Sequence, residues 1–383
     1  MTDCKVLASS AGTPEKERDM VKLGDICVKA SSNIKQSDLE GRSGAYPIYG
    51  ASGWIRDVDF YEQDKPYVAV VKDGAGAGRV MYLPERSSVI GTMQYIIPNA
   101  DINARYLAYA MDFMKLSRYC MGATIPHIYF KDYCKEELPA HSRPEQDRIA
   151  SALGKMDDCI RLRERQLEKL DELVKSKFVE MFGDPITNPY GWKTAVLSEL
   201  GYLKNGMNFH ENDSGVELYC LGVGDFQDRY KITDMSILHK ISLNEFPSSE
   251  YMLQDGDILF VRSNGNKNLV GRSITIYPKN VPTTFSGFCI RFRNTSRKIL
   301  IPYLQFMLKA KSVRAKLTGR GVNIQNLNQK MLSDLPVPIP PLDLQGRFAG
   351  FVEEVDKTKS AVRRGLSKLE TLKAASMQRY FAP

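Results

Sequence analysis

The sequence has few of the features that mark membrane, secreted or metal-binding proteins. None of its apolar runs approaches the roughly 18–20 residues that cross a bilayer, and residues 1–20 hold no apolar core of a secretory signal. The seven cysteines form no CxxC pair, which is typical of buried thiols in a cytosolic chain. We therefore expect a cytoplasmic protein.

One recurring set of metal-ligand residue types needs a separate argument. Cys120, His127, Cys134 and His141 follow one another at intervals of seven residues. Structural zinc sites use short ligand pairs such as CxxC, because one loop must deliver two ligands to the same ion. Four unrelated side chains explain this spacing better, and the sequence predicts no bound metal.

Catalytic and cofactor-binding motifs are also missing. No HExxH, GxSxG or paired-carboxylate spacing stands out, and "NPYG" (188–191) differs from the NPPY-type tetrapeptide with which adenine methyltransferases hold a base. "DGAGAG" (73–78) lacks the GK[ST] ending of a phosphate-binding loop, and the "RVMYLP" after it is typical of a strand. We expect no catalytic residue and no cofactor in this chain.

The charge of the chain is positive. It has 53 Lys and Arg against 45 Asp and Glu, a formal net charge of +8 and a pI near 8.9. Such a balance favours a polyanionic partner, but it becomes informative only where the basic residues gather on a binding surface.

The chain is a tandem duplication. Residues 123–158 resemble residues 321–356, and the long segment that follows is also repeated. The matched positions are Leu138–Pro139 with Leu335–Pro336, Gln146 with Gln345, Arg148 with Arg347, Asp157 with Asp356, Leu170 with Leu369, and Phe182 with Phe381. Upstream, the matched stretches are 21–26 with 197–203, 67–84 with 257–278, and 105–111 with 302–308.

The two copies agree best in their long C-terminal segments and in the joints, the stretches that connect each globular part to its long segment. They agree less well in the loops. Two halves that shared one catalytic site would be expected to agree best in their polar loops. The alternative that duplication only enlarged a scaffold stays open at this point.

Each half starts with a strand-rich part. Alternating apolar runs predict strands at 67–71, 79–83 and 93–98, and the glycine loop between the first two predicts a strand–turn–strand unit. Apolar residues at helical spacing predict a helix over 104–119.

Each half ends with a long amphipathic helix, over 144–183 and 341–383. Residues 144–182 contain one glycine and no proline after Pro144, and about 38 residues make a rod of about 57 Å. Apolar residues at steps of three and four predict a coiled-coil seam. The seam residues are Ile149, Leu153, Met156, Ile160, Leu167, Leu170 and Val174 in the first helix and Phe348, Val352, Val355, Val362, Leu366 and Leu369 in the second. Leu372 continues the second series.

The apolar stripes of the two helices need a cover. We expect the helices to cover each other as an antiparallel pair, which would place the two globular parts at opposite ends. The alternative is that each helix packs on its own domain.

These features together resemble the specificity subunit of type I restriction–modification enzymes. The resemblance spans essentially the whole chain, and it is carried by "ELPAHSRPEQDRIA" (137–150) with "LPVPIPPLDLQGRFA" (335–349), and by residues 177–200 with "SMQRYFAP" (376–383). The second helix start, "LDLQGR", departs modestly from "PEQDR" in the first.

The resemblance implies a DNA-binding, non-catalytic subunit. Two target recognition domains would each read one half of a split double-stranded DNA site, and the paired helices would fix the gap. Two adenine methyltransferase subunits and the restriction–translocase subunits would be its partners, and S-adenosylmethionine, ATP and Mg would belong to those partners.

The expected fold is α+β, with two strand-rich recognition domains on two long antiparallel coiled-coil helices related by a pseudo-twofold repeat. The expected divisions are an N-terminal extension (1–20), recognition domain 1 (21–143), spacer helix 1 (144–183), recognition domain 2 (184–340) and spacer helix 2 (341–383).

Candidate DNA contacts lie on the glycine-containing loops, where the backbone can approach a duplex closely. In the first domain they are Lys72, Arg79, Thr92, Gln94, Tyr95, His127, Tyr129 and Lys131. In the second domain they are Arg262, Asn264, Asn266, Lys267, Asn268, Arg272, Arg320, Asn323, Gln325, Asn326, Asn328 and Lys330.

Two other functions remain as alternatives. A duplicated enzyme, such as a fused methyltransferase–specificity chain, would bind cofactor by itself. A coiled-coil scaffold for proteins would associate independently of salt, whereas DNA binding weakens steeply as salt rises.

Overall fold

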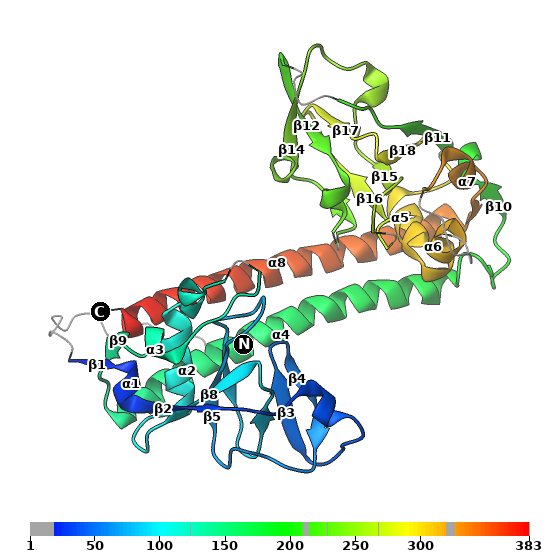
Figure 1. Cartoon of the computed structure of the whole chain (residues 1–383). Coiled ribbons are helices and arrows are strands. Elements are labelled where there is room, and N and C mark those ends of the chain that lie inside the picture. Colours follow the sequence, from blue (N-terminus) through cyan, green and yellow to red (C-terminus); the bar gives the residue numbers. More distant parts are fainter. Residues whose placement is uncertain are drawn as a thin grey trace. The chain divides into compact units, whose positions relative to one another are not determined.

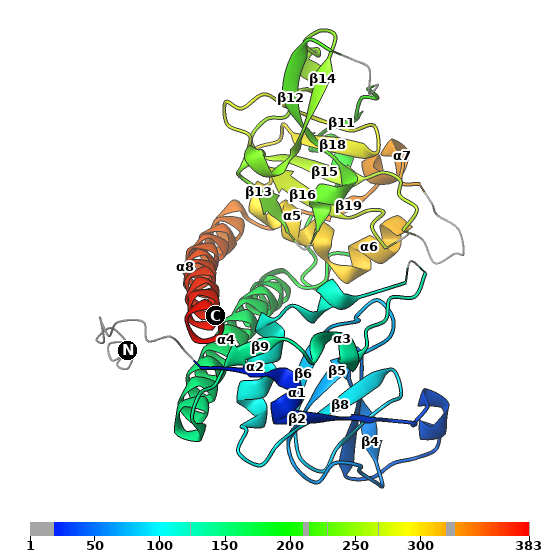
Figure 2. The same cartoon turned by 60° about the vertical axis from the view of Figure 1, so that its left-hand side comes forward.

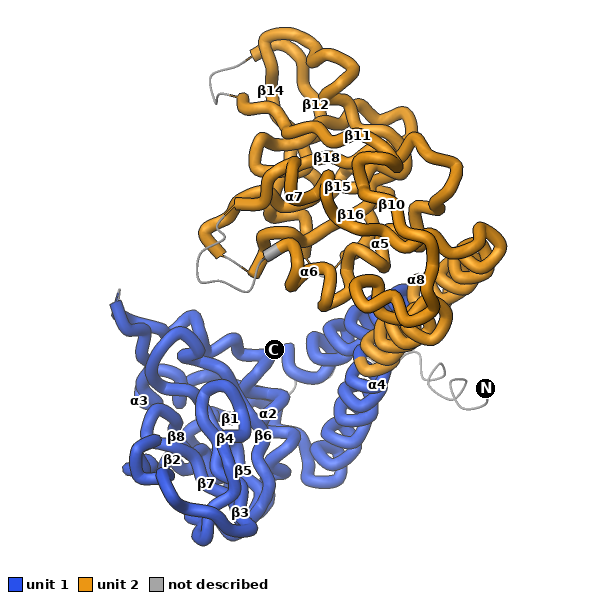
Figure 3. Tube along the Cα trace, turned by 90° about the vertical axis from the view of Figure 1, so that its right-hand side faces the viewer, with its two compact units in different colours: residues 1–164, 363–383 blue, residues 165–362 orange. Residues whose placement is uncertain are grey.

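The computed structural model describes residues 19–122, 124–209, 214–227, 229–266, 268–318 and 326–382 (Figure 1). Most of the expected N-terminal extension therefore lies outside the described residues. The chain divides into two compact units (Figure 3), unit 1 with residues 1–164 and 363–383 and unit 2 with residues 165–362. Each unit holds one strand-rich domain and a part of both long helices, which is the predicted α+β composition.

The domain of unit 1 contains a four-stranded sheet of order β2-β8-β5-β6 and a three-stranded sheet of order β4-β3-β7. A short antiparallel pair, β1 with β9, joins the start of the domain to its end. The strands are β1 (Met20–Lys22), β2 (Cys27–Ser31), β3 (Tyr46–Gly50), β4 (Gly53–Val58), β5 (Tyr67–Val71), β6 (Val80–Leu83), β7 (Ser88–Val89), β8 (Met93–Pro98) and β9 (Glu137–Pro139).

The helices of this domain are α1 (Leu23–Ile26), α2 (Ala104–Phe113) and α3 (Phe130–Tyr133). The Asn103 side chain caps α2 by accepting hydrogen bonds from the amides of Arg105 and Tyr106. The predicted helix over 104–119 was too long. Lys115 has φ 53°, a left-handed conformation that ends the helix, and a separate 3-10 turn follows at Leu116–Tyr119.

The domain of unit 2 repeats this plan. A five-stranded sheet of order β11-β18-β15-β16-β13 stands beside a three-stranded sheet of order β14-β12-β17, and β10 pairs with β19. The strands are β10 (Thr194–Val196), β11 (Gly201–Asn205), β12 (Val216–Leu221), β13 (Lys231–Ile232), β14 (His239–Leu243), β15 (Asp257–Val261), β16 (Ser273–Ile276), β17 (Thr283–Phe285), β18 (Cys289–Asn294) and β19 (Pro336–Pro338). The helices are α5 (Ile301–Lys309), α6 (Lys311–Thr318) and α7 (Gln329–Ser333).

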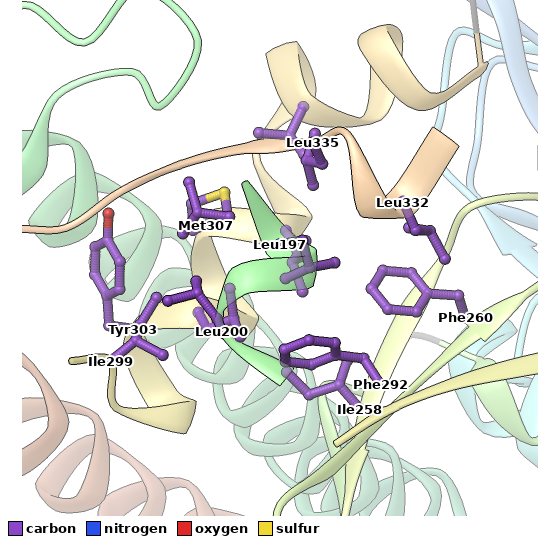
Figure 4. Packing of buried hydrophobic residues seen from close by; sticks show 14 of the residues in the cluster. Leu197, Leu200, Ile258, Phe260, Phe292, Ile299, Tyr303, Met307, Leu332 and Leu335 are labelled. Atoms are coloured by element: carbon purple, nitrogen blue, oxygen red, sulfur yellow. The ribbon is translucent and has the colours of Figure 1, made fainter. Parts of the chain in front are cut away.

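The core of unit 2 connects its sheet to its helices. Figure 4 shows Leu197, Leu200, Ile258, Phe292 and Tyr303 packed in one buried cluster. In Figure 2 the antiparallel pair of β12 and β14 stands on the far side of the large sheet from α5. Within the described part of the chain, no helix is both long and apolar enough to cross a membrane.

The repeat extends to individual hydrogen bonds at the joints. Tyr106 Oη donates to the carbonyl of Pro139, at 3.1 Å, and Tyr303 Oη donates to the carbonyl of Pro338, at 3.0 Å. Pro139 therefore corresponds to Pro338, and Leu138 to Val337. This corrects the sequence match of Leu138–Pro139 with Leu335–Pro336, which is displaced by two residues because both stretches are rich in proline.

Gln146 and Gln345 do correspond, and both are buried at the same joint. Gln146 Oε1 accepts from the amide of Asn103, at 2.9 Å, and Gln345 Oε1 accepts from the amide of Leu300, at 2.8 Å. Each glutamine thus ties the start of a long helix to the start of a domain helix.

The two long helices are α4 (Arg143–Phe182) and α8 (Leu342–Phe381). The predicted seam residues from Ile149 to Val174 and from Phe348 to Leu369 are all buried or half-buried. Leu372 is not, since its side chain is 48% exposed, and the stripe runs instead through Lys373 to Met377. The helical steps from Leu369 are therefore four and four, where the sequence pattern suggested a step of three.

Inside each unit, the segment of α4 contacts a segment of α8 from the opposite end of that helix. In unit 1, Met377 and Phe381 share a core with Ile149 and Leu153. In unit 2, the ring of Phe348 contacts that of Phe182, with centroids 5.4 Å apart. Both units thus contain the start of one helix beside the end of the other, and each domain also packs on these segments.

Candidate nucleic-acid interface

Three loops of unit 1 are held together at a single lysine. The amide of Lys72, just after β5, donates to the carbonyl of Thr92, at 3.0 Å, and the carbonyl of Lys72 accepts from the amide of Ile128, at 2.9 Å. The loop after β5, the turn before β8 and the segment before α3 therefore meet at Lys72. Residues 72–79, 91–92, 121–122 and 124–131 are called the loop cluster of unit 1.

Unit 2 repeats this arrangement around an arginine. The amide of Arg262, just after β15, donates to the carbonyl of Phe288, at 2.8 Å, and the carbonyl of Arg262 accepts from the amide of Leu327, at 2.7 Å. Residues 262–266, 268–272, 286–288 and 326–330 form the loop cluster of unit 2. The same backbone frame holds a cation in both units.

A second cation stands at an equivalent place in each cluster. The carbonyls of Arg79 and Arg272 both accept from the last residue of the preceding strand, Val71 or Val261, at 2.9 Å. The turns close through Gly78 and Gly271, with φ of 89° and 75°, a region that glycine adopts without strain. The two glycine loops are thus the same structural device, as the sequence repeat predicted.

Aromatic and cationic side chains gather in the loop cluster of unit 1. The rings of His127 and Tyr129 are 5.0 Å apart, and Lys131 Nζ lies 5.4 Å from the centroid of the Tyr129 ring. Tyr129 is 49% exposed. A solvent-exposed ring beside a lysine can stack on a base or accept a nearby phosphate.

Asparagines dominate the loop cluster of unit 2. Asn264 Oδ1 accepts from the amide of Asn266, at 2.8 Å, and Asn266 Oδ1 accepts from the amide of Asn268, at 3.0 Å. Asn326 and Asn328 are exposed, and Asn328 also caps α7 by accepting from Met331. Asparagine amides offer the paired donor and acceptor that recognise adenine in the major groove.

Two of the candidate residues lie inside unit 1 rather than at its surface. Gln94 is 7% exposed and accepts from Tyr133 Oη, at 3.1 Å. Tyr95 is 1% exposed and donates to Glu62 Oε2, at 2.6 Å. Burial raises the pKa of Tyr95, and the hydrogen bond to Glu62 raises it further. We remove both from the proposed interface, because their polar atoms are used inside the domain. Their strand, β8, is buried between neighbouring strands, which the motif alone did not reveal.

The remaining candidates of unit 1 lie in its loop cluster, with Lys72 and His127 half-buried and Arg79, Thr92, Tyr129 and Lys131 exposed. In unit 2 the cluster brings together Arg262, Asn264, Asn266, Asn268, Arg272, Asn326, Asn328 and Lys330. Lys267, Arg320, Asn323 and Gln325 lie outside the described residues.

Apolar side chains also belong to these clusters, and they are not among the residues predicted from the sequence. Phe288 is 59% exposed at the position equivalent to Thr92, and Ile125 is 65% exposed beside His127. The available sequence signal was the glycine-containing "SGF" (286–288) directly before an apolar strand pattern. Such side chains can contact a thymine methyl group or a base face.

Of the four Cys and His residues at seven-residue intervals, Cys120 and His141 make separate contacts. Cys120 Sγ donates to the carbonyl of Ala77, and His141 Nδ1 lies 2.8 Å from Tyr106 Oη. Among residues for which the structure gives a placement, no group of three His, Cys, Asp or Glu is arranged to hold a metal ion.

Comparison with known proteins shows which family has this architecture. The model of the type I restriction modification DNA specificity domain matches residues 15–172 and 189–371. The StySPI specificity subunit of a type I restriction enzyme from Salmonella potsdam is 26% identical over 291 residues, covering 70% of this chain and 61% of the relative. The EcoKI specificity subunit from Escherichia coli K12 is 22% identical over 298 residues, covering 70% and 61%. The chain therefore spans less than two thirds of the length of these relatives.

Solved structures share the fold over nearly the whole chain. The type I restriction–modification S subunit from M. genitalium has a TM-score of 0.61 at 15% identity and covers 97% of this chain, with 98% of its own length matched. A chain from a study of complex assembly and conformational transition of the type I R-M system has a TM-score of 0.57 at 15% identity, with 94% and 97% covered. The chain belongs to the family of type I restriction modification DNA specificity domain proteins and carries that domain twice.

Proposed function

We propose that the chain is the DNA specificity subunit of a type I restriction–modification system, in which each domain reads one half of a bipartite duplex site. The observation that carries this proposal is the matched pair of loop clusters. The same three-loop frame holds Lys72 in one unit and Arg262 in the other. Two copies of one frame with different side chains suit two readers of different sequences.

In this proposal α4 and α8 form an antiparallel coiled coil that fixes the distance between the two half-sites. Each helix has 40 residues and runs on continuously, which at 1.5 Å per residue gives a rod of about 60 Å. Rods of that length can space two readers that face the same side of B-DNA one turn, about 34–36 Å, apart.

The catalytic work would belong to partner subunits. Two adenine methyltransferase subunits would dock on the helices and bring S-adenosylmethionine, while restriction–translocase subunits would bring ATP and Mg. The chain itself positions DNA for them.

The test is a map of methylated sites in cells that express the chain with its methyltransferase partner. We expect an asymmetric motif in two parts. Lys72→Ala should lower methylation by weakening contacts at one half-site, and Arg262→Ala should do so at the other, whereas Lys65→Ala, an exposed site outside the loop clusters, should leave the map unchanged. A single uninterrupted motif, or two variants that affect the same base pairs, would contradict the proposal.

A further inference from the structure

A strongly basic pocket lies inside unit 2, between the C-terminal part of α4 and the domain packed against it. Its volume is about 310 Å³. Among the described residues that line it there is one carboxylate, Asp171, and there are five cationic side chains, Lys175, Arg229, Arg272, Lys309 and Arg314.

The single carboxylate does not balance these charges, because it already has a cation of its own. Asp171 Oδ1 lies 2.5 Å from Nζ of Lys359, a residue of α8 whose side chain is 5% exposed. Asp228 lies outside the described residues, and the described lining has more cationic side chains than one further carboxylate could balance.

Backbone carbonyls hold the cations in place. Arg314 Nη2 and Arg272 Nε both donate to the carbonyl of Asn268, at 3.0 and 3.3 Å, and Lys309 Nζ donates to the carbonyl of Arg229, at 2.7 Å. Burial lowers the pKa of Arg314, and the positive charge of Arg272 lowers it further. Two guanidinium groups are thus held close to each other at one wall, where their like charges repel.

The equivalent pocket of unit 1 has the opposite character. Tyr106 and Tyr303 are equivalent, so Asp112 in α2 takes the place of Lys309 in α5. The pocket at Asp112 also contains the carboxylates of Asp157 and Glu370, with two lysines. Each unit therefore has a pocket at this position of its domain helix, and of these two pockets, by their described lining residues, the one in unit 2 is the attractive site for anions.

We propose that the pocket of unit 2 binds one phosphate group. Guanidinium forks match the oxygens of a phosphate in two-point contacts, and lysines at the rim add charge without demanding a fixed geometry. Because Arg272 belongs also to the loop cluster, the phosphate can come from the backbone of bound DNA. Binding of a DNA phosphate rests on the proposed function, whereas binding of a free phosphate does not depend on it.

The test compares phosphate and DNA binding by the full chain. Inorganic phosphate is titrated at constant ionic strength by calorimetry and ³¹P NMR, and we expect one saturable site. Replacing the exposed pair Lys175→Gln and Arg229→Gln should weaken phosphate binding by about tenfold or more, since two charged contacts are lost. The control double variant, Lys169→Gln with Lys240→Gln, removes the same charge from exposed positions of unit 2 outside the pocket and should bind phosphate like the parent.

The salt dependence of duplex binding identifies the source. If the phosphate is that of DNA, the slope of log K against log salt should fall by about 0.9 in the pocket variant and stay unchanged in the control. An unchanged slope with weakened phosphate binding assigns the pocket to a free phosphate group. Equal phosphate binding by the parent and the pocket variant, or none by the parent, overturns the proposal. Absence of duplex binding by the parent would instead count against the proposed function, and the phosphate titration would still decide the pocket.

Discussion

Lys359 and Asp171 form a salt bridge of 2.5 Å across the two long helices of unit 2. A second bridge, between Lys373 and Asp157 at 2.6 Å, joins the same two helices in unit 1. Asp171 follows Asp157 by two heptads along α4, and Lys359 precedes Lys373 by two heptads along α8. The register of the antiparallel contact is therefore identical in the two units, and a slip of one turn would break both bridges.

Asp171→Ala should destabilise unit 2 by about 2 kcal/mol, because it leaves the buried ammonium of Lys359 without its partner. This is below the 3–5 kcal/mol typical of a fully buried pair, since Asp171 is half exposed. The free energy of unfolding from urea titration is the measurement. Glu354→Ala, which breaks an exposed bridge to Lys357, should change it by less than about 0.5 kcal/mol.

The double variant Lys359→Met with Asp171→Leu separates stability from register. It should be nearly as stable as the parent, because an apolar pair replaces a charged one in the seam. It should nevertheless lose the preference for a single register, which double electron–electron resonance between labels on the two helices would detect as a broadened distance distribution. A distribution as narrow as that of the parent would show that the bridge does not set the register.

Gln345→Leu should destabilise the joint of unit 2 by about 2–3 kcal/mol. Gln345 is fully buried, and the variant leaves the amide of Leu300 and the carbonyls of Lys298 and Pro340 without their partner. Hydrogen exchange at the Leu300 amide should become faster, and the urea midpoint should fall. Gln378→Leu, at an exposed position of the same helix, is the matched control and should cost less than about 0.5 kcal/mol. Equal effects of the two variants would refute the assigned role.

Gly78→Ala should be much more harmful than Gly74→Ala, although both glycines have φ near 90°. A Cβ at Gly78 would lie 2.4 Å from the amide nitrogen of Ser117, whereas a Cβ at Gly74 meets nothing within 4 Å. Gly74→Ala should therefore cost about 1–2 kcal/mol from backbone strain alone. Gly78→Ala should cost more and displace the loop that carries Arg79. Thermal unfolding of the two variants, measured side by side, gives the comparison, and similar losses would contradict it.

The sequence predicted the repeat, the strands tested above and the two long helices, because these depend on periodic patterns that local residues impose. It did not predict the end of α2, where Lys115 enters a left-handed conformation without a glycine to signal it. It also misplaced Gln94 and Tyr95, since alternation along a strand cannot show what packs on each of its faces. Tyr95 packs with Tyr49 and Val89 of the three-stranded sheet, and Gln94 accepts from Tyr133 of α3.

Long-range contacts explain the remaining differences at the candidate site. The frame around Lys72 joins three loops that are far apart in the sequence, and only the fold brings them together. The same holds for the basic pocket of unit 2, whose residues come from α4, α5, α6 and the large sheet. The residue types in the sequence indicated the candidates, and the tertiary structure showed which of them lie together in the loop clusters.

The most direct test of the helices as a spacer is a paired deletion. Residues 158–164 of α4 and 366–372 of α8 lie opposite each other in the common register, so removing both heptads keeps both salt bridges and brings them one heptad apart. The rods shorten by about 10 Å, which equals about three base pairs of B-DNA. Mapping of methylated sites should show the same two half-sites with a gap shortened by about that amount. The same half-sites at an unchanged gap would contradict the account.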